Sequence, residues 1–252
     1  MSGRALSSFS VVACLLVAGC AGGMSDAGVT AAVEPTLRAA AMTAEASGDY
    51  QGAAQHWRTL FQAHPDDKGV AVSLARALRA GGQPQQGADI MQLSLARLGR
   101  DGDFLAELGK DYLADQRLGL ALKALDEARA LHPNRWDVPS ATGVCYDLQG
   151  RYDESGAAYA AALALSPDNP QVLNNLGLSQ ALAGKLDDGI ATLRRANEQP
   201  GGGVQVRQNL AMLLALKGDP AAAERLASHD LPPDMARVNA EIFRRLAQQS
   251  RH

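Results

Sequence analysis

The chain has 252 residues, and its 24 Lys and Arg against 27 Asp and Glu give a formal net charge of −3. This balance offers no basic excess for binding nucleic acid, and the apolar fraction of 46% is too high for a disordered chain. The apolar residues are mostly Ala and Leu, whereas aromatic residues make up only 4%. Such a composition favours helices that pack closely through small side chains, and the length allows one or two domains.

The first segment, residues 1–19, has the features of a signal peptide. Arg4 precedes an apolar stretch over residues 9–18, which is shorter than the roughly 20 residues needed to span a bilayer. The stretch ends in Val17-Ala18-Gly19-Cys20, which resembles the lipobox of bacterial lipoproteins. The resemblance implies cleavage before Cys20 and fatty-acyl chains, such as palmitate, on that residue. Cys14 ends a similar pattern, but cleavage there would leave too short an apolar core. The alternative is an ordinary secretory signal in which Cys20 is incidental.

The residues around Cys20 also bear on localisation. Two or three acyl chains would hold the protein at a membrane, because a single chain anchors only marginally. Ala21 follows the Cys, in place of the Asp that retains such lipoproteins in the inner membrane. The resemblance thus implies an outer-membrane protein whose body lies in the periplasm. Cleavage leaves Cys20 and Cys145, so lipidation excludes an internal disulfide, and Cys145 is predicted to be a buried, small apolar residue.

Residues 20–33 are rich in Gly, Ala and Ser without periodicity, and they are predicted to form a flexible tether behind the lipidated Cys. From residue 34 the sequence repeats every 34 residues, and six repeats fill residues 34–237. The eighth and twentieth positions of each repeat always hold a small residue, as close helix contacts require. The fifteenth position is Gly in five of the six repeats, which is typical of the turn after a helix. The repeats start at Glu34, Lys68, Gly102, Trp136, Pro170 and Val204, and the small residues are Ala41, Ala53, Ala75, Gly87, Gly109, Ala121, Gly143, Ser155, Gly177, Gly189, Ala211 and Ala223.

This pattern resembles the tetratricopeptide repeat (TPR), in which two antiparallel helices occupy about 34 residues. The fourth repeat matches best, with Gly143, Tyr146, Gly150, Tyr159 and Pro167 at the recurrent positions. The resemblance implies an all-α fold, a right-handed superhelix (α-solenoid) of about six helix hairpins. A capping helix is predicted over residues 233–249, because the last repeat of a solenoid would otherwise expose an apolar face. Its predicted apolar side consists of Met235, Val238, Ile242, Phe243 and Leu246.

Residues that could support catalysis or metal binding are scattered. The five histidines lie far apart, and the sequence contains no zinc-binding, phosphate-binding or nucleophile motif. Two carboxylate pairs, Asp66-Asp67 and Asp187-Asp188, fall at turns or helix starts, where acidic residues are favoured for structural reasons. The sequence therefore predicts no enzyme, with no catalytic residue, metal site, cofactor or small-molecule substrate.

The TPR resemblance also implies a groove, lined by the second, fifth, sixth, ninth and twelfth positions of the first helices. In the fifth and sixth repeats these positions are rich in side-chain amides, which suit an extended peptide through hydrogen bonds to its backbone. Asn175 and Asn209 share the sixth position, but the Lys and Arg with which chaperone-binding TPRs grip a C-terminal carboxylate are missing. A purely structural role for these Asn residues is an equal alternative. The predicted groove residues are Asp147, Gln171, Asn174, Asn175, Leu178, Gln205, Gln208, Asn209 and Met212.

The second half of the chain is similar to TadD-type proteins, which are TPR lipoproteins of tight-adherence (Tad/Flp) pilus assembly. The similarity lies in residues 174–178, 183–196 and 206–211, in Gly218-Asp219 and in Leu231-Pro232-Pro233. It implies a non-enzymatic scaffold on the periplasmic face of the outer membrane. Such a scaffold would bind an extended segment of the pilus secretin or of another assembly component. The alternative is a general envelope adaptor for peptidoglycan hydrolases or for outer-membrane protein assembly.

Overall fold

The computed structural model describes residues 26–249, and the side-chain surroundings of residues 33–245. The predicted signal peptide, Cys20 and the first residues of the tether lie outside this range. Every element within it is a helix, which confirms the all-α fold class. The helices are α1 (Asp26–Ala46), α2 (Tyr50–Ala63), α3 (Lys68–Ala80), α4 (Pro84–Leu98), α5 (Gly102–Ala114), α6 (Leu118–Leu131), α7 (Asp137–Asp147), α8 (Tyr152–Leu165), α9 (Pro170–Leu182), α10 (Leu186–Asn197), α11 (Val204–Leu216), α12 (Pro220–Ala227) and α13 (Pro233–Gln249).

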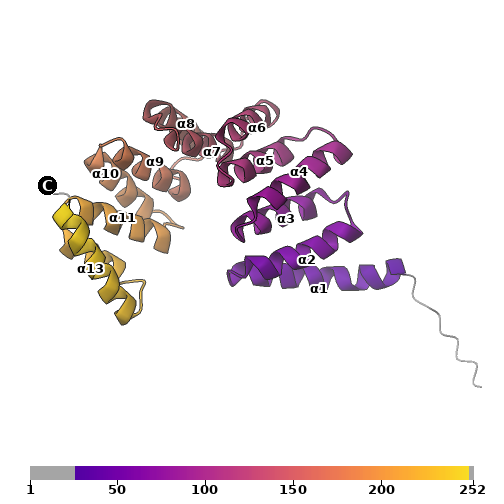
Figure 1. The fold of residues 1–252 in the computed structure, drawn as a ribbon, viewed down its shortest axis with the longest axis horizontal. Coiled ribbons are helices and arrows are strands. Elements are labelled where there is room, and N and C mark those ends of the chain that lie inside the picture. Colours follow the sequence, from indigo (N-terminus) through magenta and orange to yellow (C-terminus); the bar gives the residue numbers. More distant parts are fainter. Residues whose placement is uncertain (1–25, 250–252) are drawn as a thin grey trace, which may run out of the picture.

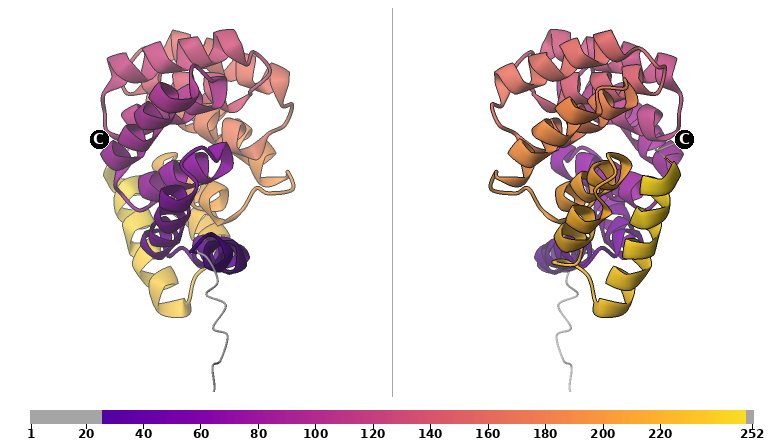
Figure 2. Two further views of the ribbon diagram at one scale, coloured as in Figure 1. Left: turned by 90° about the vertical axis from the view of Figure 1, so that its right-hand side faces the viewer. Right: turned by 90° about the vertical axis from the view of Figure 1, so that its left-hand side faces the viewer.

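The helices pair into hairpins that stack side by side into an arch (Figure 1). From α3 onward each odd-numbered helix contacts the next odd-numbered one, so these helices share one surface. They lie toward the inside of the arch, whereas α4, α6, α8 and α10 lie on its outside (Figure 1). The arch rises from α1 to α6–α8 and returns to α13, which leaves the first and last helices on the same side (Figure 2). None of the helices within residues 26–249 has the length and apolar content needed to cross a membrane.

Local signals in the sequence explain where helices begin and end. Asp67, Asp101 and Asn169 each accept hydrogen bonds from backbone N–H groups of the helix that follows, which satisfies groups that have no partner within the helix. All six residues at the fifteenth repeat position have a positive φ, between 58° and 90°. Five of these are Gly, and the sixth is Gln116, for which the left-handed conformation is costly.

The twelve small residues at the eighth and twentieth repeat positions are all buried. Several lie where the two helices of a hairpin come closest. A Cβ atom on Gly143 would stand 2.7 Å from ring atoms of Tyr159, and one on Gly177 would stand 2.8 Å from Cγ of Leu193. Since real side chains do not approach that closely, larger residues at these positions would force the helices apart.

The structure corrects the expected tether. Helix α1 begins at Asp26, so residues 26–33 are helical and are not part of a flexible linker. Residues 26–33 lack a hydrophobic period, which suggested a flexible segment. Ala-rich sequence nevertheless forms helices readily without such a period. The acidic residue at the helix start is also favourable there.

The last helix has the range predicted for the capping helix, and it packs on α11 and α12. Its orientation differs from the prediction. Ala240 and Phe243 are buried, whereas Met235, Val238 and Ile242 are 54%, 60% and 47% exposed. Close packing against two helices favours the face that bears the small Ala240. Met235, Val238 and Ile242 are therefore left exposed at the end of the solenoid.

Candidate functional site

Side-chain amides of α9 and α11 form a hydrogen-bonded chain on the inner surface of the arch. Asn209 donates to Oδ1 of Asn174 over 2.8 Å, and Asn174 donates to Oδ1 of Asn175 over 3.3 Å. Asn174 is only 6% exposed, while Asn175 and Asn209 are half-buried. The bond between the helices joins the fifth position of one repeat, Asn174, to the sixth position of the next, Asn209. We call Asn174, Asn175 and Asn209 the amide cluster.

A hollow of about 450 Å³ lies beside the amide cluster, at the N-terminal ends of α9 and α11. Gln171 and Gln205 are exposed at its rim, and both can donate and accept hydrogen bonds. We call it the amide hollow. It is lined by Pro170, Gln171, Asn174, Asn175, Gly201, Gly203, Val204, Gln205 and Val206.

A second hollow, of about 530 Å³, lies toward the C-terminal ends of the same two helices, and its lining is almost wholly apolar. Leu178 and Met212 occupy the ninth position of their repeats, and Leu182, which is 63% exposed, stands at the hollow's edge. We call it the apolar hollow. It is lined by Leu178, Ala181, Leu182, Gly184, Leu186, Met212, Leu213 and Leu216.

Two of the nine predicted groove residues are engaged inside the protein instead. Gln208 accepts a hydrogen bond from Asn239 of the capping helix and donates to the backbone oxygen of Ala227, each over 3.3 Å. Asp147 accepts from the hydroxyl groups of Tyr159 (2.7 Å) and Ser179 (2.6 Å). Asp147 therefore joins the fourth repeat to the fifth. The other seven residues lie in the amide cluster or line the two hollows.

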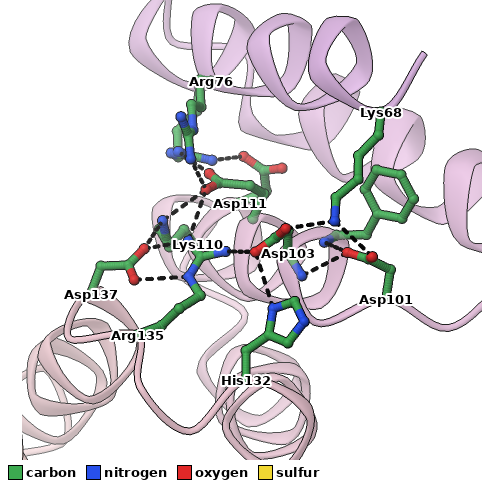
Figure 3. Close-up of polar contacts among 12 residues, drawn as sticks. Lys68, Arg76, Asp101, Asp103, Lys110, Asp111, His132, Arg135 and Asp137 are labelled. Atoms are coloured by element: carbon green, nitrogen blue, oxygen red, sulfur yellow. Dashed lines mark hydrogen bonds and ion pairs between the residues drawn. The ribbon is translucent and has the colours of Figure 1, made fainter.

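The inner surface of α3, α5 and α7 contains an ionic cluster that the sequence interpretation missed (Figure 3). Glu107 is its centre: Oε1 contacts Arg76 at 2.8 Å and Lys110 at 2.9 Å, and Oε2 contacts Arg79 at 2.8 Å. Each contact except that of Lys110 joins side chains on different helices. The cluster consists of Lys68, Arg76, Arg79, Asp101, Asp103, Glu107, Lys110, Asp111, His132, Arg135 and Asp137.

The cluster could have been found from the repeat register. Arg76 and Lys110 occupy the ninth position of the second and third repeats, and Asp103 and Asp137 occupy the second position of the third and fourth. These are the same positions that predicted the groove in the fifth and sixth repeats. Applying that rule to every repeat would have placed these charges on the inner surface, although not their pairing.

The two central carboxyl groups have pKa shifts in opposite directions, although burial disfavours the charged form of both. Burial alone disfavours the charged form of Glu107, but hydrogen bonds and charges from the surrounding cations outweigh it and hold its pKa well below the usual range. Burial raises the pKa of Asp111 to about 7, and Arg79 offsets this only in part. Oδ1 of Asp111 accepts from Arg79 over 2.6 Å, whereas Oδ2 is buried without a hydrogen-bond partner among the described residues. A proton on Oδ2 reduces the cost of that burial, so Asp111 is only partly ionised near neutral pH.

The ionic cluster fills the inner surface at the centre of the arch. Glu107 and Asp111 have fully buried side chains, and Ala106 beside them is also buried. The cations Arg79, Lys110 and Arg135 cover these residues and are themselves about one fifth exposed. A ligand on the inner surface therefore meets the amide and apolar hollows at α9 and α11, but a closed surface over α5.

The described residues offer binding groups on the inner surface. Within residues 26–249, His, Cys, Asp and Glu form no group of three that could hold a metal ion. Cys145 is fully buried, and burial raises the pKa of its thiol to about 11, which makes it a poor nucleophile. The inner surface instead offers amide donors and acceptors beside an apolar hollow, a combination that can bind a polypeptide segment.

Comparison with known proteins places the chain in a family. No curated protein matches it in sequence. In fold it is similar to a thermophilic TPR protein from Thermus thermophilus, with 24% identity, a TM-score of 0.66, and 72% of this chain and 98% of that chain covered. It is also similar to PilF of Pseudomonas aeruginosa, with 14% identity, a TM-score of 0.58, and 85% and 99% covered. The tetratricopeptide repeat family model matches residues 38–102, 107–170 and 149–204, so the chain belongs to the tetratricopeptide repeat family.

Proposed function

We propose that this protein is a lipid-anchored scaffold of the periplasm, which binds an extended segment of a pilus-assembly component through α9 and α11. Tetratricopeptide repeats imply a protein–protein interaction scaffold, and proteins built from them are generally non-catalytic. The observation that carries the groove proposal is the position of the apolar hollow beside the amide cluster. An apolar side chain of the partner enters the apolar hollow, while the amide cluster binds the adjacent backbone.

The finer parts of the proposal rest on sequence. The lipobox-like residues ending in Cys20 support a lipid anchor, and Ala21 after it supports the outer membrane. The TadD-like residues support a role in Tad/Flp pilus assembly, with the secretin as a candidate partner. These residues include Asn174, Asn175 and Leu178, which line the two hollows.

The groove can be tested with one exposed side chain and a matched control. Leu182 lies at the edge of the apolar hollow and is 63% exposed, whereas Leu93 lies on the outer helix α4 and is 53% exposed. Because both side chains are exposed, Leu182→Asp and Leu93→Asp should leave the fold intact. We expect Leu182→Asp to reduce surface pili and adherence nearly as far as gene deletion does, and Leu93→Asp to leave both normal. Pili are counted by electron microscopy, with protein level and membrane fractionation measured in parallel.

The possible failures separate the parts of the proposal. Normal pili after gene deletion would exclude the pilus role. Pili lost on deletion but normal in the Leu182→Asp strain would place the binding site elsewhere. Cys20→Ala tests the anchor: the protein should move from the membrane fraction to the soluble periplasmic fraction, and an unchanged distribution would contradict lipidation at Cys20.

A further inference from the structure

The amide hollow and the apolar hollow adjoin along the same two helices. Asn175 and Leu178 lie three residues apart on α9, and Asn209 and Met212 lie three residues apart on α11. Residues three apart in a helix are neighbours on one face, so each hollow continues the other by about one helical turn. The two hollows therefore form one groove along α9 and α11, and we call it the α9–α11 groove.

Among the described residues, none that lines the α9–α11 groove is charged. In the chain as a whole 20% of the residues are charged. Helix α9 contains no Asp, Glu, Lys or Arg, and α11 contains only Arg207. Arg207 donates to both carboxylate oxygens of Asp230, over 2.7 Å and 2.6 Å. The groove therefore presents amide groups and apolar surface without a free charge.

Charged residues next to the groove are exposed or already paired. Lys185, in the turn after α9, is exposed, so water and salt screen its charge. Lys217, at the end of α11, pairs with Asp187. The helix N-termini at the amide hollow attract a negative charge only weakly, and Asn169 already caps that of α9. These groups leave the interior of the groove without a counter-charge for a charged ligand.

The equivalent positions of earlier repeats are charged. The ninth repeat position is apolar in α9 and α11, whereas α3 and α5 carry Arg76 and Lys110 there. Both cations pair with Glu107, at the sixth position, where α9 and α11 carry Asn. The inner surface thus changes from paired charges to uncharged groups between α5 and α9.

We propose that the α9–α11 groove selects an uncharged extended segment of a partner protein and excludes segments with charged side chains at that place. An apolar side chain of the segment enters the apolar hollow, and its backbone bonds to the amide cluster. A charged side chain in the groove would lose hydration without gaining a counter-charge, which disfavours its binding. This inference rests on the proposed function, and it adds the class of segment that the site takes.

The length of the segment follows from the helices. Gln171 at the rim of the amide hollow and Leu182 at the edge of the apolar hollow are eleven residues apart on α9. A helix rises about 1.5 Å per residue, so the groove is about 16 Å long. An extended chain advances about 3.3 Å per residue, so about five residues fill the groove. We therefore expect the absence of charge to extend over about five consecutive residues of the partner.

A displayed library of random peptides about 12 residues long, which exceeds the length of the groove, is a suitable probe when it is selected against the purified full chain in detergent. We expect each selected peptide to contain Leu, Ile, Met or Phe within a stretch of about five residues that lacks Asp, Glu, Lys and Arg. Its affinity, measured by fluorescence anisotropy, should change less than about twofold between low salt and about 0.5 M NaCl. Leu182→Asp should abolish this binding, and Leu93→Asp on the outer helix α4 should not.

Met212→Lys provides a reciprocal test. Met212 occupies the repeat position that holds Arg76 in α3 and Lys110 in α5, so a repeat accommodates a long cationic side chain there. Met212→Lys supplies the missing counter-charge and should enrich Asp or Glu in the selected stretch at least about tenfold. Leu93→Lys, at a 53% exposed position of α4, adds the same charge outside the groove and is the control. If circular dichroism shows that Met212→Lys unfolds, Leu182→Lys at the 63% exposed edge of the groove takes its place.

The outcomes separate this inference from the proposed function. Charged residues in the selected stretch at the frequency of the unselected library would overturn the inference and leave the groove proposal standing. A Met212→Lys selection that matches the wild-type one, or an equal enrichment of acids by the Leu93→Lys control, would also overturn it. If no peptide is selected, the inference fails. The groove proposal fails with it only if Leu182→Asp leaves pili and adherence normal.

Discussion

A close contact between α9 and α10 offers a sharp test of the packing. Gly189 of α10 lies against Gly177 of α9, and a Cβ atom on Gly189 would stand 2.5 Å from the backbone oxygen of Gly177. It would also stand 3.3 Å from the backbone N of Ala181. Both neighbours are backbone atoms, which a change of side-chain rotamer cannot move. Gly189→Ala must therefore push the two helices apart.

The expected magnitude follows from two opposing effects. Overpacking costs about 1–3 kcal/mol, and a clash with rigid backbone lies at the upper end of that range. Replacing Gly by Ala within a helix contributes about 1 kcal/mol of favourable helix propensity. Gly189→Ala should therefore destabilise the protein by about 2 kcal/mol. Gly156, inside α8, has no atom within 4 Å of its Cβ direction, so Gly156→Ala should stabilise it by about 1 kcal/mol.

Thermal and urea unfolding followed by circular dichroism measures both variants. For a chain of this size 1 kcal/mol corresponds to about 2–4 °C in Tm. Because a solenoid can unfold repeat by repeat, hydrogen exchange of α9 and α10 should accompany the melting curves. A Gly189→Ala protein that melts at or above the wild-type temperature would refute the close helix contact. A rise in Tm for both variants would show that helix propensity, rather than packing, decides the result.

Three further changes have defined outcomes. Gln116→Gly removes a left-handed non-Gly residue and should raise stability by about 1 kcal/mol, measured as a rise in Tm; a fall would contradict the turn geometry. Burial disfavours ionisation of Asp137, but hydrogen bonds from Arg135 and Lys110 outweigh it and lower its pKa to about 2. Since the folded-state pKa lies below the unfolded value, this contribution is present above about pH 4 and is lost as the pH falls toward 2. Asp137→Asn should therefore lose about 2 kcal/mol at neutral pH and show a shallower decline in acid, and an unchanged acid slope would exclude the pairing. Cys145 should resist thiol reagents at pH 8 in the folded protein and react on unfolding, measured in a chain with Cys14 and Cys20 replaced by Ser; rapid labelling of the native state would contradict its burial.

The sequence by itself determined the local and periodic features of the protein. Small residues such as Gly143 and Gly177 recur at a fixed interval, and a residue's position within the repeat decides whether it faces the partner helix of its own hairpin. The TPR resemblance, applied to the same register, predicted the inner positions of α9 and α11, and hence Asn174 and Met212. These features can be predicted from the sequence because each depends on residues within a single repeat.

Only the tertiary structure decided how the inner surface is divided. Arg76, Glu107 and Asp137 are about thirty residues apart in sequence, and each alone resembles an ordinary solvated charge. Stacking of three repeats brings them into one cluster, which closes the centre of the arch and leaves the two hollows at α9 and α11. Stacking likewise set the orientation of α13 and gave Asp147 partners on α8 and α9. These outcomes depend on the angle and offset between repeats, which arise from packing over the whole array and are not encoded in any one repeat.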